Sequence, residues 1–176
     1  MGEPKSEKSD LSDNIETILT IETLRRELEE AFRGRAHLYR AIYDELAVSL
    51  GADAAEQLLA RAIERRGREV AQALFQDASS GARAVGDKFL AVSPDGGRMY
   101  PCQVERRAAG MTIRVDRCPL KDAWTHAGLA PERVAQLCRI AGAFDKGLFE
   151  AAGVRFANEP WRSDRDSGCC WIHLDD

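Results

Sequence analysis

The last third of this 176-residue chain holds four of its five cysteines and two of its three histidines. Cys118 stands before a proline at the end of an expected strand, and Cys138 and Asp145 fall in an expected helix. The segment 166–171, Asp-Ser-Gly-Cys-Cys-Trp, opens an expected final strand. A thiolate is both a nucleophile and a zinc ligand, and a carboxyl group can move protons. The segment 117–174 therefore predicts the position of a site.

Asp145 is the most informative of these residues. It follows Cys138 and Ala141 at i, i+3 and i+7 spacing, so it projects from the apolar face of its helix. A buried carboxylate must be paired, ligated or protonated, because desolvating it alone is prohibitive. A purely structural hydrogen bond to Asp145 would explain this pattern as well as catalysis does.

Two reactive arrangements fit the residues. In the first, the Cys118 thiolate attacks an electrophilic carbon while Asp145 or His126 moves protons. In the second, Cys118, Cys138 and Cys169 converge on Zn²⁺, which activates water. The cysteines are scattered and form no C-x-x-C pair, so we expect no cofactor and keep zinc as the alternative, beside a structural thiol cluster.

Candidates for substrate contact are Arg117, Trp171 and Cys169. Arg117 could hold a carboxylate, although a surface salt bridge would explain it equally. Strand alternation places Cys169, Trp171 and His173 on one face, which could line a cleft, and begins the opposite core face with Cys170. The adjacent cysteines leave open which of the two belongs to the site.

The upstream elements must position these residues. Residues 1–14 are charged and predict a disordered tail, and the apolar positions of 15–34 predict a helix that could pack on a second copy of the chain. Gly34 predicts a break before a further helix that ends at Gly51. The following helix contains Gly67, where another element is expected to approach closely.

Alternation in two stretches, 100–104 and 111–115, predicts an antiparallel hairpin connected by 106–110. Helices are expected over 120–127 and from Pro131 onward, then a loop over 158–166 and the final strand. The predicted fold class is α+β, with an antiparallel sheet flanked by N-terminal helices and a C-terminal helix.

Composition narrows the classes of function. Hydrophobic residues at 44% and charged residues at 31% suit one soluble globular domain. A net charge of −4 argues against nucleic-acid binding, and no apolar run reaches the length of a membrane span. An odd number of cysteines without an export signal predicts free thiols in the cytoplasm. We expect a small-molecule substrate and a homodimer as the partners.

Taken together, Cys118-Pro119, the helix with Cys138 and Asp145, and the pattern Asp166-x-x-Cys169-x-Trp171 resemble the L-2-amino-thiazoline-4-carboxylic acid hydrolase family. The resemblance covers residues 35–176 and leaves the N-terminal helix outside it. The closing aspartate of the family usually follows glycine, whereas Arg165 stands here. This departure concerns the catalytic assignment more than the fold.

The resemblance implies a hydrolase that opens a small cyclic amidine or thiazoline ring by adding water to C=N and gives a carbamoyl-amino acid. Such proteins also occur in specialised metabolism. The C-terminal region is also similar to the small-molecule-binding domain of vinyl-reductase-type proteins. The alternative is therefore a non-catalytic small-molecule-binding or metal-sensing module on the same scaffold.

Overall fold

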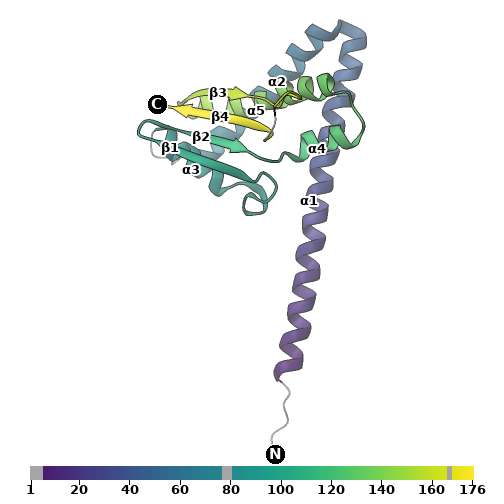
Figure 1. The fold of residues 1–176 in the computed structure, drawn as a ribbon, viewed down its shortest axis with the longest axis vertical. Coiled ribbons are helices and arrows are strands. Elements are labelled where there is room, and N and C mark those ends of the chain that lie inside the picture. Colours follow the sequence, from purple (N-terminus) through teal and green to yellow (C-terminus); the bar gives the residue numbers. More distant parts are fainter. Residues whose placement is uncertain (1–5, 77–80, 166–167) are drawn as a thin grey trace, which may run out of the picture.

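The computed structural model describes residues 6–76, 81–165 and 168–176 (Figure 1). Four strands form one antiparallel sheet in the order β1-β2-β4-β3, which confirms the predicted α+β class. The elements in chain order are α1 (Ser6–Leu50), α2 (Ala52–Leu74), α3 (Ala82–Ala91), η1 (Pro94–Gly97), β1 (Cys102–Arg107), β2 (Gly110–Val115), α4 (Pro119–His126), α5 (Pro131–Ala151), β3 (Arg155–Glu159) and β4 (Cys170–Asp175).

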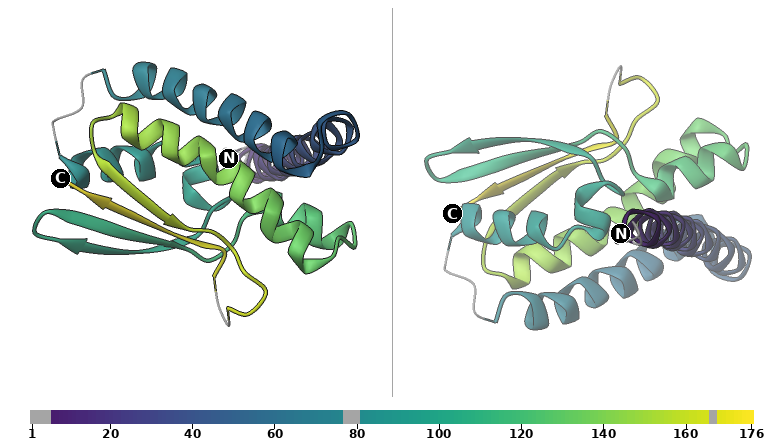
Figure 2. Two further views of the ribbon diagram at one scale, coloured as in Figure 1. Left: turned by 90° about the horizontal axis from the view of Figure 1, so that it is seen from above. Right: turned by 90° about the horizontal axis from the view of Figure 1, so that it is seen from below.

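Helices α3 and α5 cover one face of the sheet, and α2 lies on the far side of α5 (Figure 2). The ring of Phe149 on α5 links these elements, because its centroid lies 5.0 Å from that of Phe89 on α3 and 5.7 Å from that of Phe156 on β3. The predicted alternation of the strands is confirmed. The inner face of the sheet carries the apolar side chains Cys102, Val104, Met111, Ile113, Val115, Ile172 and Leu174.

Helix α1 is continuous, so the predicted break at Gly34 is wrong. A glycine inside a helix costs about 1 kcal/mol relative to alanine. Phe32 and Ala36 on either side are buried, and burying a side chain the size of Phe32 contributes roughly 1.5–3 kcal/mol, which exceeds that cost. The helix starts at Ser6, inside the segment predicted as a tail, while residues 1–5 lie outside the described part.

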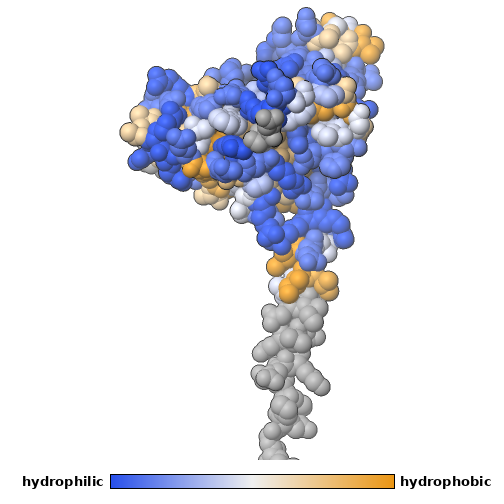
Figure 3. Space-filling view, in the orientation of Figure 1, coloured by the Kyte–Doolittle hydropathy of each residue, from blue (hydrophilic) through white to orange (hydrophobic). Residues whose placement is uncertain are grey.

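Only the C-terminal half of α1 joins the body of the protein (Figure 1). Trp124 of α4 is completely buried, and its indole N–H donates to the carbonyl oxygen of Ala36 at 2.8 Å. This hydrogen bond holds α4 against α1 at Ala36, and it thereby helps to position Cys118, the residue before α4. The preceding part of α1 projects away from the sheet, and apolar side chains gather on it (Figure 3).

Helices α2 and α5 cross at two glycines. A Cβ atom on Gly67 would collide with the backbone of α5 at Phe144, and one on Gly147 would collide with the carbonyl oxygen of Glu64 on α2. The close approach predicted at Gly67 is confirmed. The two backbones pack without intervening side chains, which fixes the position of α5 and of every residue it carries.

The sequence reading missed β3. Residues Asn158 and Glu159 were predicted to begin a loop, but they end a strand that pairs antiparallel with β4. The strand is short, and its inner face carries Phe156 and the polar residue Asn158. Because of this polar residue, the sequence shows no alternation of apolar residues that would predict a strand here. In the described part of the chain, no helix has the length and apolar character needed to cross a membrane.

Candidate functional site

The molecule has two hydrophobic clusters, one among α1, α2, α4 and α5 and the other between the sheet and its helices. Four residues belong to the border of both: Tyr100, Cys118, Phe144 and Trp161. Each of the four keeps part of its surface exposed. The border is therefore a place where a reactive side chain is packed by the core and still reaches the surface.

Cys118 lies at the turn from β2 into α4, where it is the residue before the first helical position. Its thiol is hydrogen-bonded to that of Cys169, and this bond, followed by burial, raises the pKa of Cys118 well above its ordinary value. The backbone amides of Leu120 and Lys121, at the start of α4, act in the opposite direction. At neutral pH the Cys118 side chain is therefore a protonated thiol, next to two backbone amides that would stabilise its thiolate.

Cys169 lies just before β4 and is buried, with only 4% of its surface exposed. Its amide donates to the carbonyl oxygen of Val115 at 2.6 Å, which ties the closing segment to the end of β2. The alternation that placed Cys169 on the face of Trp171 is wrong, because the regular strand begins one residue later at Cys170. Asp166, the first residue of the closing pattern, lies outside the described residues.

The thiol of Cys138 completes the cluster. Burial raises its pKa, and the neighbouring Cys118 raises it further. The pKa of Cys169 is also raised: its hydrogen bond with Cys118 lowers it, but Cys170 and burial outweigh that effect. The structure thus brings together the three cysteines predicted to converge, as protonated thiols.

Asp145 lies two turns beyond Cys138 on α5 and keeps part of its surface exposed. Burial raises the pKa of its carboxyl group to about 7. In the described residues, no hydrogen bond or ion pair joins this carboxyl group to a partner. Its charge acts on Tyr100, whose pKa is raised by burial first and then by Cys118 and Asp145. Asp145 can therefore gain or lose a proton near neutral pH.

The predicted zinc site gains no support from this geometry. Among the residues that the structure describes, no three histidine, cysteine, aspartate or glutamate side chains are arranged to hold a metal ion. The thiols of Cys118 and Cys169 are engaged with each other instead.

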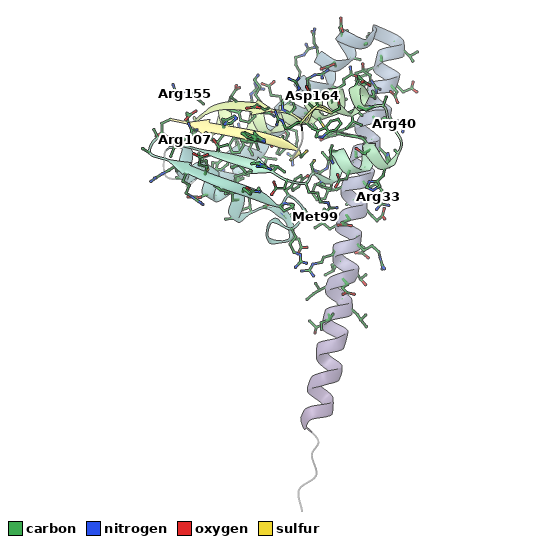
Figure 4. The ribbon with its side chains drawn as sticks, in the orientation of Figure 1. Arg33, Arg40, Met99, Arg107, Arg155 and Asp164 are labelled. Carbon is green, nitrogen blue, oxygen red and sulfur yellow. The ribbon has the colours of Figure 1, made fainter. Side chains whose placement is uncertain are left out.

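Arg117 and His126 lie elsewhere, in a groove of about 470 Å³ between α1 and α4. Arg117 donates to Asp122 at 3.0 Å and to Glu29 at 3.4 Å, so it is already paired. The Nδ1 atom of His126 lies 2.7 Å from the carbonyl oxygen of Asp122. Arg33, which also lines the groove, extends from α1 below α4 in Figure 4. The structure does not bring Arg117 and His126 into the thiol cluster.

Trp171 is also apart from the cluster. It points to the open face of the sheet, where its ring lies 5.8 Å from the guanidinium carbon of Arg114 and 5.6 Å from that of Arg165. Trp171 belongs to neither of the two hydrophobic clusters.

Three residues near the cluster were missed by sequence reasoning. Tyr100 packs against both hydrophobic clusters. Lys121 forms an ion pair with Asp122 at 2.7 Å. It also lies close enough to Cys118 and Cys169 for their thiolate charges to raise its pKa. Asn158 points inward from β3 toward α5. The helix start after Cys118 could have revealed Lys121, whereas Asn158 becomes visible only once β3 is recognised.

Comparison with known proteins supports the family resemblance. The family model described as L-2-amino-thiazoline-4-carboxylic acid hydrolase matches residues 31–169. A search of curated proteins gives no match. Among solved structures, a trafficking protein particle complex subunit 3 from Naegleria fowleri, covalently bound to palmitic acid, is similar in fold. The TM-score is 0.54 at 14% identity, over 83% of this chain and 96% of that one.

Proposed function

Because the chain belongs to the L-2-amino-thiazoline-4-carboxylic acid hydrolase family, we propose that it opens a small cyclic amidine or thiazoline ring by adding water to the C=N bond. The observation that carries this proposal is the hydrogen-bonded pair of Cys118 and Cys169 beside the border of the two hydrophobic clusters, where Tyr100 lies close enough to both Cys118 and Asp145 for each to raise its pKa.

Hydration of a C=N bond needs a nucleophile, a proton for the nitrogen and stabilisation of a tetrahedral intermediate. In our proposal the Cys118 sulfur adds to the amidine carbon while Asp145 donates its proton to the ring nitrogen and takes up the proton of the Cys118 thiol. The ring C–S bond of the tetrahedral intermediate then breaks, and the ring sulfur leaves as a thiol with a proton from the former amidine nitrogens. Water adds to the carbon that is still bonded to Cys118, and loss of the Cys118 thiol gives the carbamoyl product. The amides at the start of α4 and the ammonium group of Lys121 favour the thiolate while it exists.

The alternative is a binding module without turnover. The high pKa of the thiols favours it, because a protonated thiol is a poor nucleophile. The similar trafficking subunit, which holds palmitic acid covalently, shows that this fold can carry a bound small molecule. On this reading the chain would bind its ligand and release it unchanged.

The experiment that separates the two is direct. Purified protein is incubated with 2-amino-thiazoline-4-carboxylate, and mass spectrometry follows the addition of one water molecule. We expect the ring-opened carbamoyl product with wild type and with Arg155→Ala, a surface control at the far end of the sheet (Figure 4). Binding of this compound without any gain of water would favour the binding module.

The replacement Asp145→Asn should lower kcat by roughly 10²–10⁴-fold, the range for loss of a positioned acid or base. In the wild type, kcat should fall as pH rises through about 7, because the carboxyl group must be protonated to donate. Tyr100 is a titratable neighbour of Asp145, and its pKa is raised by burial first and then by Cys118 and Asp145. Profiles of kcat against pH for the wild type and for Asp145→Asn check this. The prediction is contradicted if kcat of Asp145→Asn still falls as the pH rises through about 7.

The same replacement should stabilise the fold at neutral pH. The folded pKa of Asp145 lies above the unfolded value, so stability is greatest below the unfolded pKa and is lost as pH rises toward 7. Asp145→Asn should therefore gain about 1–2 kcal/mol at pH 8 relative to pH 4, after allowing for the part of the group that stays hydrated. Urea unfolding at both pH values measures the difference.

We also propose that a second copy of the chain packs on the projecting part of α1. Ile18, Leu19 and Leu24 are each more than half exposed there. The apolar face of an amphipathic helix is normally buried against another surface. Glu22, Arg26 and Glu27 lie in or next to this part of α1, so two copies can pair opposite charges.

Sedimentation should show a dimer for the wild type. Leu24→Glu should shift it to a monomer, because a charge would then replace an apolar contact. Val48→Glu is the matched control: Val48 lies on the same helix and is 87% exposed, but at the opposite end, so this variant should remain dimeric. A monomeric wild type at micromolar concentration would end the proposal.

The five cysteines are free, as a reducing compartment would keep them, and we place the reaction in the cytoplasm on that basis. Amino-acid salvage and specialised metabolism are the two settings that the proposed chemistry fits. Neighbouring genes would distinguish them.

A further inference from the structure

We propose that Cys118 and Cys169 form an oxidative modification site, at which a hydroperoxide converts the two thiols into one reversible disulfide bond. The bond occupies the sulfur atom of Cys118, so it switches the site off until a thiol reductant opens it again. The loss of turnover rests on the proposed function, because it needs Cys118 as the nucleophile. Formation of the bond itself does not depend on that function.

The two thiols are already in contact in the reduced protein. The side chain of Cys118 is hydrogen-bonded to that of Cys169, and both cysteines are free. Two cysteines can be joined without a large backbone movement only if their side chains point toward each other. The hydrogen bond shows that this pair meets the requirement.

Backbone contacts hold the pair together independently of the thiols. The amide of Cys169 donates to the carbonyl oxygen of Val115 at 2.6 Å, and Cys118 follows Val115 by three residues, at the turn into α4. On the other side of this turn, Trp124 donates to the carbonyl oxygen of Ala36 at 2.8 Å. The start of α4 and the start of β4, which are far apart in the sequence, are therefore positioned for a bond between them.

The two thiols differ in exposure, which gives them different roles. Cys118 keeps part of its surface exposed, so a small hydroperoxide can reach its sulfur, whereas Cys169 is buried. Peroxides oxidise the thiolate, and the amides of Leu120 and Lys121 favour the thiolate of Cys118. Cys118 is therefore the thiol that is oxidised first. Cys169 needs no contact with solvent, because its reaction partner is Cys118.

The reaction balances with one molecule of hydrogen peroxide. The Cys118 thiolate attacks one peroxide oxygen and forms sulfenic acid, the O–O bond breaks, and the released hydroxide takes up the proton that Cys118 lost. The Cys169 sulfur then attacks the sulfenic sulfur, the S–O bond breaks, and the departing hydroxide leaves as water with the Cys169 proton. Two thiols and one peroxide give one disulfide and two water molecules. A dithiol reverses the change by exchange and is itself oxidised to a disulfide.

Two further thiols lie beside the pair and could compete with it. Cys170 is hydrogen-bonded to Cys169, but a bond between these adjacent residues would close a small, strained ring through their shared peptide. Cys138 lies close enough to Cys118 for the charge of Cys118 to raise its pKa, but no hydrogen bond joins these two thiols in the described residues. The direct contact therefore favours the bond between Cys118 and Cys169.

The test treats the reduced, full-length protein with hydrogen peroxide, labels the remaining thiols with N-ethylmaleimide after denaturation, and maps the tryptic peptides by mass spectrometry. Trypsin places Cys118 in peptide 118–121 and Cys169 in peptide 166–176. Wild type should lose two of its five labels and gain a linked pair of these peptides, lighter by two hydrogen atoms than the separate peptides. Dithiothreitol should open the link and restore all five labels.

The variants identify which cysteine of peptide 166–176 forms the bond. Cys170→Ser should keep the link, whereas Cys169→Ala should lose it, and peroxide should then add oxygen atoms to peptide 118–121. Cys102→Ser, which changes a thiol outside the cluster, is the matched control and should form the link as wild type does. The measurement on wild type remains decisive if a variant does not fold.

Ring opening provides a second readout. Turnover by wild type should fall in proportion to the fraction of linked protein and should return after dithiothreitol. Full turnover by fully linked protein would overturn the switch. The inference is also overturned if wild type keeps all five labels, if peroxide adds oxygen to Cys118 without forming the link, or if the link joins another pair of cysteines.

Failure of this inference is distinct from failure of the proposed function. A reversible link between Cys118 and Cys169 in a protein that opens no thiazoline ring would retain the modification site and remove the hydrolase. Ring opening by a protein that forms no such link would do the reverse.

Discussion

Replacement of Cys118 by serine should reduce turnover of a thiazoline substrate by at least ~10³-fold, because the proposed nucleophile is sulfur. A serine hydroxyl at this position would be surrounded by the same amides of α4, but its pKa is far higher than that of a thiol. The partner thiol of Cys169 and the neighbouring Lys121 would remain in place. Single-turnover kinetics with mass spectrometry of the protein measures both the rate and any covalent adduct.

Cys102→Ser provides the control. Cys102 lies on β1, and burial followed by the charge of Asp116 raises its pKa, so it is a partly buried thiol outside the cluster. Its replacement should change turnover by less than about twofold, because Cys102 lies on the edge strand β1, outside the thiol cluster. Full activity of Cys118→Ser would exclude the thiolate mechanism and leave Asp145 to activate water directly.

Gly147→Ala should destabilise the protein by about 3 kcal/mol or more, because the added methyl group would enter the backbone of α2 at Glu64. Neither helix can move away cheaply, since Gly67 and Gly147 hold the two backbones in contact on both sides of the crossing. Urea unfolding, followed by circular dichroism, measures the loss. The site should suffer too, because α5 carries Cys138 and Asp145.

The matched control is Gly34→Ala. Gly34 lies inside α1, and nothing stands within 4 Å of the position of its Cβ atom. The same chemical change should therefore stabilise the protein by up to about 1 kcal/mol through helix propensity. Equal effects of the two replacements would show that α2 and α5 do not depend on this close crossing.

Several elements could be predicted because a local pattern determined them. The alternating strands of the hairpin, the proline-started α5 and the short helix holding Trp124 follow from residue periodicity and from proline positions. The prediction of Asp145 as an unusual acid also depended only on helical spacing. These features are local, and local physics is what a sequence displays most directly.

Other features depend on contacts between distant segments. The continuity of α1 through Gly34 depends on how Phe32 and Ala36 pack, which the spacing of apolar residues does not reveal. β3 exists because β4 pairs with it, and the inward position of Asn158 follows from that pairing alone. For the same reason, the sequence could place Cys118, Cys138 and Cys169 in one segment but could not separate Arg117, His126 and Trp171 from them.

The length of α1 has a consequence for assembly. A helix of 45 residues extends roughly 68 Å at 1.5 Å per residue. About 27 Å of helix separates Ile18 from Ala36, where Trp124 is fastened. In the proposed dimer, a rigid spacer of this length would hold the contact between the copies away from the thiols, so the proposed substrate would enter and leave each copy without dissociation of the dimer.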